Sequence, residues 1–193
     1  MRWFLLLAVF VGFATPGFAD VKSCADLFQN GPKALGGYVR SKSKNHEKEV
    51  SGAGYATTYG RVTGDHATVF YYTKHQRRPS FQFIVEELMI STGMAIDVRL
   101  THWAKRGLTH YDPYQADQPF LTIEEVAKHP NPVSVQSRIN MSPGGVAAAN
   151  DYVTLGVMNN CIVKLRYSTS GPRQSADRKF ERIRADLLRH FAG

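Results

Sequence analysis

Residues 152–167 read Tyr-Val-Thr-Leu-Gly-Val-Met-Asn-Asn-Cys-Ile-Val-Lys-Leu-Arg-Tyr, and this stretch decides the fold class. Two runs rich in β-branched and aromatic residues flank Asn159 and Asn160. Asparagine tolerates the positive φ that a tight hairpin turn requires. The pattern therefore predicts a β-hairpin. In its second strand every other residue from Cys161 onward is apolar or aromatic, so Cys161 is predicted to point toward packed surface.

Further strands are predicted on both sides of a helical region. Residues 55–59 and 67–73 are separated by a turn at 62–65, and the second of these segments is rich enough in β-branched and aromatic residues to be a central strand. Residues 133–141 alternate apolar and polar side chains, which is typical of a half-exposed strand. The charged stretch 40–49 predicts a solvated loop or a mobile strand edge.

Two long segments have helical periodicity. Ser80 can cap a helix that begins at Phe81, which we expect to be one long helix or two helices meeting near Gly93. Ser175 can cap a final helix that runs to about His190. The apolar stripe of that final helix is predicted to comprise Phe180, Ile183, Leu187, Leu188 and Phe191.

Shorter helical signals occur near the start of the chain and in the proline-rich middle. Residues 20–29 predict a short helical turn, and Thr122 with Glu125 resembles a capping box for a short helix through Lys128. The chain contains no internal repeat. The economical architecture is one α+β domain with a mainly antiparallel sheet flanked by helices.

The N-terminus has the three parts of a secretory signal. Arg2 precedes an apolar run at 3–13, and small residues stand at Gly17 and Ala19 before Asp20. A membrane anchor is the competing interpretation, but eleven helical residues rise only about 16 Å, roughly half the hydrocarbon thickness of a bilayer. We therefore expect cleavage before Asp20.

Cleavage would divide the chain into a signal peptide at 1–19 and one domain at 20–193. Removing 19 of the 193 residues leaves 174, which is enough to bury a core without a metal or dense disulfides. No further membrane segment is expected, and the predicted location is periplasmic or secreted. Lipid attachment at Cys24 is an alternative, although Lys22 stands where a lipid-attachment motif requires a small residue.

Cys24 and Cys161 are the two cysteines of the chain. An oxidising compartment favours a bond between them, and two cysteines so far apart form neither a redox CxxC pair nor a structural zinc site. We predict a Cys24–Cys161 disulfide. Two buried free thiols are the alternative.

The chain is basic, with a net charge of +8 and an isoelectric point near 9.6. The outward face of the final helix carries Arg178, Arg182 and Arg189, which are candidates for binding an anionic surface. For an exported protein, lipid headgroups, cell-wall polymers and acidic proteins are nearer than nucleic acid, which we do not expect as a partner. Simple solubility is the alternative explanation of the charge.

The sequence contains no strong catalytic or cofactor motif. The seven histidines include no pair with helical i, i+4 spacing and no HExxH, so neither a metal nor a cofactor is expected. Glu86 and Glu87 are adjacent and therefore about 100° apart around a helix, so they cannot readily face one substrate as a paired acid and base. Both are expected to be solvated.

The segment between the two long helical regions is rich in aromatic residues. Trp103, Tyr111 and Tyr114 could line a ligand groove in the segment 103–120. Alternatively, Trp103 ends the long helix inside the core.

The order of elements from Gly54 to Phe191 resembles the PsbP-like family. The similarity rests on Gly54-Tyr55 leading into the strand at 67–73, then a helix, then the segments 152–156 and 161–167, and a closing amphipathic helix. This family is named for the extrinsic subunit P of the photosystem II oxygen-evolving complex. The resemblance implies an αβα sandwich that acts as a non-enzymatic scaffold for a protein partner or small ligand, and it assigns no functional residue.

The sequence is therefore compatible with two functions. The first is a non-catalytic exported domain that binds a protein partner, an envelope component or a small ligand. The alternative is a small envelope hydrolase whose site is assembled from scattered histidines and carboxylates, such as His102, His110 and Asp112.

Overall fold

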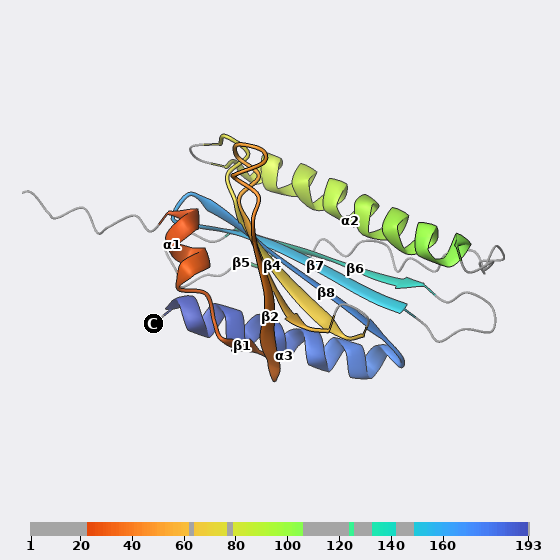
Figure 1. Cartoon of the computed structure of the whole chain (residues 1–193). Coiled ribbons are helices and arrows are strands. Elements are labelled where there is room, and N and C mark those ends of the chain that lie inside the picture. The colour runs from red at the N-terminus through yellow and green to blue at the C-terminus, as the bar shows by residue number, and fades with distance from the viewer. Residues whose placement is uncertain are drawn as a thin grey trace, which may run out of the picture.

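An antiparallel sheet forms the middle layer of the molecule, with helices on both of its faces (Figure 1). The computed structural model describes residues 23–61, 64–76, 79–105, 124–125, 133–141 and 149–192. Within these ranges the sheet has eight strands, in the order β1 (Ala34–Leu35), β2 (Tyr38–Asn45), β3 (Tyr55–Gly60), β4 (His66–Tyr72), β8 (Cys161–Ser170), β7 (Ala149–Met158), β6 (Val133–Met141) and β5 (Glu124–Glu125). Helix α2 (Phe81–Ala104) covers one face, and α1 (Cys24–Gln29) and α3 (Arg173–Ala192) lie against the other. The predicted α+β class is confirmed.

The β7–β8 hairpin forms as the sequence predicts, and it lies near the centre of the sheet. Asn159 and Asn160 adopt φ values of 50° and 64°, and Met158 pairs with Cys161 across the turn. On its other side β8 pairs with β4, with Val69 opposite Leu165. Strand β4, which the sequence predicts to be central, lies between β3 and β8.

The α3 face of the sheet holds the larger core. The predicted inward residues Phe180, Ile183 and Leu187 are buried there, and Phe191 packs against them. Leu188, which the sequence places on the same stripe, is 43% exposed, so that part of the prediction is wrong. One residue turns a helix by about 100°, so Leu187 and Leu188 cannot both face the sheet.

Helix α2 packs on the opposite face as one continuous helix. Ser80 caps it as predicted, because its side chain accepts a hydrogen bond from the Phe83 amide. The helix passes through Gly93 without a break. Ile84 and Leu88 are buried in a second apolar cluster formed with the sheet.

Three local predictions need correction. Residues 38–45 form strand β2, paired with β3, where a solvated loop was one of the two expectations. Glu124–Glu125 form a strand instead of part of a helix, because they pair with β6; the remainder of the predicted helix through Lys128 lies outside the described residues. The last helix begins at Arg173, because the Pro172 carbonyl accepts the Ala176 amide and closes a turn ahead of Ser175.

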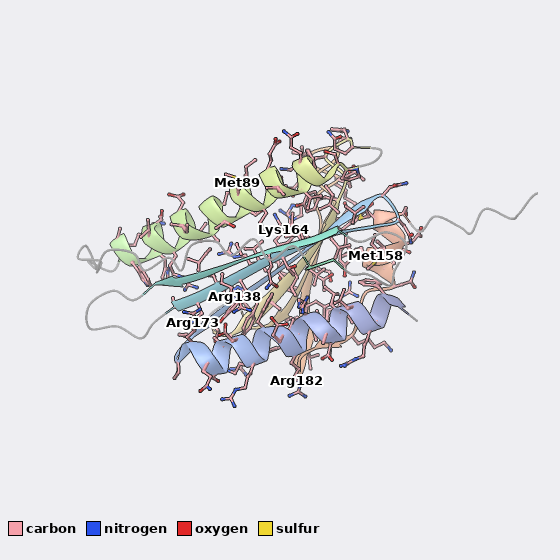
Figure 2. The ribbon with its side chains drawn as sticks, turned by 180° about the vertical axis from the view of Figure 1, so that it is seen from behind. Met89, Arg138, Met158, Lys164, Arg173 and Arg182 are labelled. Carbon is pink, nitrogen blue, oxygen red and sulfur yellow. A yellow bond between two sulfur atoms is a disulfide. The ribbon has the colours of Figure 1, made fainter. Side chains whose placement is uncertain are left out.

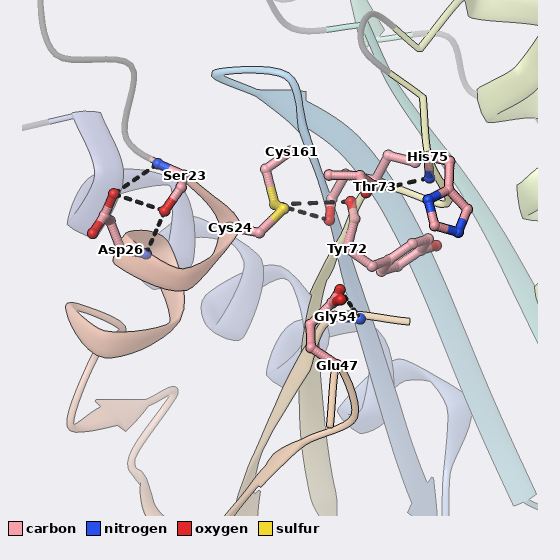
Figure 3. The surroundings of a disulfide bond; sticks show 10 residues. Ser23, Cys24, Asp26, Glu47, Gly54, Tyr72, Thr73, His75 and Cys161 are labelled. Atoms are coloured by element: carbon pink, nitrogen blue, oxygen red, sulfur yellow. Dashed lines mark hydrogen bonds between the residues drawn. A yellow bond between two sulfur atoms is a disulfide. The ribbon is translucent and has the colours of Figure 1, made fainter. Parts of the chain in front are cut away.

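Cys24 and Cys161 form the predicted disulfide (Figure 3). Their Cα atoms lie 5.3 Å apart although 137 positions separate the two residues in the sequence. Helix α1 is fixed locally by a capping box between Ser23 and Asp26. The bridge therefore attaches α1 to the central strand β8.

Candidate functional site

Three arginines of α3 form a stripe on the side of the helix that faces away from the sheet. Arg178, Arg182 and Arg189 are all exposed, and Figure 2 shows Arg182 pointing outward. Arg182 lies four positions after Arg178, so their Cα atoms differ by about 6 Å along the helix axis. We call these three residues the arginine stripe. Its position agrees with the outward face that the sequence predicts.

The neighbouring cations are paired with carboxylates. Lys179 donates to Asp65 at 2.7 Å, and Arg184 donates to Glu181 at 3.0 Å. Arg189, at one end of the stripe, contacts Asp186 on its own helix. Within the described part of the chain, Arg178 and Arg182 contact no carboxylate.

Two of the acidic residues of α3, Asp177 and Glu181, lie on the side of the helix that faces β6. Arg138 of β6 lies 3.8 Å from Asp177 and 3.6 Å from Glu181, and Arg173 lies 3.9 Å from Asp177 (Figure 2). These contacts direct the carboxylates toward the sheet. The outer surface of α3 is consequently left with uncompensated positive charge at Arg178 and Arg182.

The predicted aromatic groove is not supported at Trp103. Its side chain is 5% exposed and belongs to a small apolar cluster with Ala95, Ile139 and Ala149. The alternative interpretation, in which Trp103 ends the long helix inside the core, is therefore confirmed. Tyr111 and Tyr114 lie outside the described residues.

A buried ionic cluster between α2 and the sheet is the feature that the sequence interpretation missed. Glu86 is exposed as expected, but Glu87 is 3% exposed, so the expectation that both are solvated is wrong. Glu87 accepts a hydrogen bond from the Tyr72 hydroxyl at 2.9 Å and contacts Lys74. Because α2 turns by about 100° per residue, adjacent glutamates face different surroundings.

Lys164 of β8 completes this cluster. Its Nζ lies 3.8 Å from Oε1 of Glu87 and donates to the Ser91 hydroxyl at 3.2 Å. The same ammonium lies 4.8 Å from the centre of the Phe70 ring and 5.2 Å from that of Tyr72. Burial lowers the pKa of Lys164, and the Glu87 carboxylate opposes this shift.

A second ionic cluster lies further along α2. Asp151 of β7 is 1% exposed, and its Oδ2 accepts two hydrogen bonds from Arg99, at 2.9 and 3.1 Å. Arg166 lies 3.6 Å from the same carboxylate, which also accepts from Ser168. The two clusters connect α2 to the sheet through charge as well as apolar contact. No periodicity argument could find them, because each combines residues from elements far apart in the chain.

The residues expected in a hydrolase site are not assembled in the described ranges. His102 is exposed, and His110 and Asp112 lie outside those ranges. Across the described residues, no group of three or more His, Cys, Asp or Glu side chains could hold a metal ion. No described helix is long and apolar enough to span a bilayer.

Comparisons with known proteins add no identification. No family model, curated protein or solved structure matches the chain.

Proposed function

We propose that the protein is a non-catalytic exported domain that binds an anionic component of the cell envelope through the arginine stripe. The observation that carries this proposal is the pair Arg178 and Arg182, exposed one helical turn apart while neighbouring cations are paired with carboxylates. A guanidinium left free in this way can make two parallel hydrogen bonds to a phosphate or carboxylate. The net charge of +8 favours approach to the same kind of surface.

Export is part of the proposal. The N-terminal signal pattern supports it, and the Cys24–Cys161 disulfide is compatible with an oxidising compartment. Intact mass of the protein from a secreting host tests this part. A mature chain that begins at Asp20 is the expected result, whereas retained residues 1–19 or a lipid on Cys24 would contradict it.

We also propose that the fold is related to the PsbP-like αβα sandwiches. Support comes from the helices on both faces of the antiparallel sheet and from the amphipathic helix α3 that closes the chain.

Vesicle binding tests the role of the arginine stripe. The mature domain is titrated with vesicles of phosphatidylglycerol and phosphatidylethanolamine, and with neutral phosphatidylcholine vesicles, over a range of salt concentrations. Each arginine near an anionic surface contributes about 1 kcal/mol to the free energy of binding. Changing all three stripe arginines to alanine should therefore weaken binding roughly 100-fold and make it less dependent on salt concentration.

The matched control removes the same charge elsewhere. Lys33, Lys42 and Lys48 are exposed, and their triple alanine variant has the same net charge as the stripe variant. It should retain most of the binding. Equal losses in the two variants would show that net charge alone attracts the protein, and no binding to anionic vesicles would reject a lipid surface as the partner.

A second proposal retains the hydrolase class, because one pair of residues favours it. Ser91 Oγ lies 3.2 Å from Lys164 Nζ, and burial lowers the pKa of Lys164, as a lysine acting as general base for a serine requires. Ser91 is only 6% exposed, so a substrate would have to displace α2. Labelling of Ser91 by a fluorophosphonate, abolished in Lys164→Met, would support this function, and an unlabelled Ser91 would reject it.

A further inference from the structure

The outer surface of α2 carries a group of exposed large apolar side chains. Met89, Ile90, Met94 and Val98 are 65%, 54%, 61% and 55% exposed, and Figure 2 shows Met89 on the side away from the sheet. Single exposed apolar residues are normal on a protein surface, whereas groups of adjacent ones are typical of interaction sites. These four lie within ten residues of α2, on the face of the molecule opposite the arginine stripe.

Three of these side chains belong to one row along the helix. Ile90, Met94 and Val98 are spaced by four residues, and the same spacing continues to Glu86 at one end and to His102 at the other. Glu86 and His102 are both exposed. Rows with this spacing form the ridges that pack between two helices in the commonest class of helix contact, at a crossing angle of about −50°. We call these five residues the α2 row.

The α2 row is complementary to itself when two copies run antiparallel. With Met94 on the two-fold axis, Ile90 lies at the level of Val98 of the second copy and Glu86 at the level of its His102. Apolar residues then meet in the centre, and at each end a carboxylate meets an imidazole, whose N–H can donate to it. A parallel arrangement would place Glu86 beside Glu86, which is unfavourable. Closed two-fold contacts between identical surfaces are the commonest form of protein self-association.

We propose that the α2 row is the contact surface for a second copy of this chain, which forms an antiparallel two-fold dimer centred on Met94. The residues at the two ends of the row favour this occupant, because the Glu86 carboxylate can accept a hydrogen bond from the His102 imidazole of the second copy only across an antiparallel pair. Dimerisation would place the two arginine stripes on opposite outer sides of the assembly. The inference does not depend on what the stripes bind.

Cysteine cross-linking tests the position of the two-fold axis. Met94→Cys places a thiol next to its own copy, so mild oxidation of the mature chain should produce a covalent dimer. Met89→Cys is the matched control, since Met89 is equally exposed on the same helix but lies outside the α2 row. Rapid cross-linking at position 94 and not at position 89 is the expected result. Equal cross-linking at both positions, or none at position 94, would overturn the proposal.

Sedimentation over a range of protein concentrations tests the energetics. Met94→Lys brings two like charges together and should raise the dimer dissociation constant at least ~10-fold, while Met89→Lys should change it less than ~3-fold. Both variants should keep the thermal stability of the unaltered chain, because both methionines are exposed. A chain that remains monomeric up to about 100 μM would overturn the dimer.

Charge exchange separates antiparallel from parallel pairing. Glu86→Lys alone should weaken association, and adding His102→Glu should restore it, because a lysine and a glutamate then lie opposite each other in the antiparallel dimer. Failure of the double variant to recover would overturn the antiparallel arrangement. Monomers that bind neutral phosphatidylcholine vesicles, and lose this binding in Met94→Lys, would assign the α2 row to a lipid surface instead of a second copy.

Discussion

Oε1 of Glu87 and Nζ of Lys164 lie 3.8 Å apart beneath α2, in the layer where the helix meets the sheet. Glu87 is 3% exposed, and it also accepts a hydrogen bond from the Tyr72 hydroxyl. A carboxylate in such a place is compensated by its partners and not by water. Through Glu87, α2 is therefore tied to Tyr72 of β4 and to Lys164 of β8.

The two adjacent glutamates of α2 should respond very differently to neutralisation. Glu87→Gln leaves Lys164 buried without its carboxylate and should lower the free energy of unfolding by about 3 kcal/mol. Glu86→Gln removes an exposed carboxylate that accepts a hydrogen bond from Gln82, and it should change the free energy of unfolding by less than about 0.5 kcal/mol. Urea melts of both variants measure the difference. Equal effects would contradict the burial of Glu87.

Two adjacent leucines near the end of α3 provide a second matched pair. Leu187→Ala should destabilise the domain by about 2 to 5 kcal/mol, because a buried side chain is lost and a cavity remains. Leu188→Ala and Arg182→Ala, at exposed positions, should each cost less than about 1 kcal/mol. Chemical denaturation of the three variants is the measurement. Similar losses at positions 187 and 188 would mean that the assigned faces of α3 are wrong.

The disulfide should contribute substantially to stability. Closing a loop between residues 137 positions apart stabilises the folded state by about 4 to 5 kcal/mol in the chain-entropy model. The variant with both Cys24 and Cys161 changed to serine should therefore unfold at a clearly lower urea concentration. Adding reductant should shift the midpoint of the unaltered protein toward that of the variant. Two alkylatable thiols in denatured, unreduced protein would show that the bond does not form.

Five buried tyrosines predict a loss of stability in alkaline solution. Burial raises the pKa of Tyr59 to about 12, and it also raises the pKa values of Tyr71, Tyr72, Tyr152 and Tyr167. A phenol whose pKa is higher in the folded state stabilises the fold fully below pH 10, and this contribution decreases as the pH rises from about 10 toward 12.

Urea melts between pH 8 and pH 11, with tyrosinate absorbance recorded in parallel, measure this effect. The midpoint should fall above about pH 10, and tyrosinate should appear together with unfolding. Ionisation of these tyrosines near pH 10 in protein that is still folded would contradict their burial. Lys164 has the opposite effect on stability. Because its pKa is lower in the folded state, its contribution to the free energy of unfolding increases as the pH rises toward 10.5.

Local sequence patterns predict the elements whose structure depends on neighbouring residues. The hairpin follows from two β-rich runs around Asn159 and Asn160, and the start of α2 follows from Ser80. The buried stripe of α3 follows from helical periodicity, except at Leu188. In each case the pattern and the structure that it predicts involve residues close together in the sequence.

The arginine stripe is predictable for the same reason, but the buried ionic clusters are not. Exposure of Arg178 and Arg182 follows from the apolar stripe on the other side of their helix. Whether a carboxylate lies beside these two arginines depends on Arg138 of β6. Arg138 contacts Asp177 and Glu181 on the side of α3 that faces the sheet. The absence of a facing carboxylate at Arg178 and Arg182 is thus a tertiary property of the described structure.

The sequence alone determined the class of the fold, the hairpin, the inward face of α3 and the two cysteines available for a bond. Only the tertiary structure decided that β4 lies beside β8, that Glu87 is buried against Lys164 and that Trp103 belongs to the core. Periodicity reports which side of a segment is apolar, because that depends on residues a few positions apart. It does not report which distant segment covers that side, because that choice depends on the packing of the whole chain.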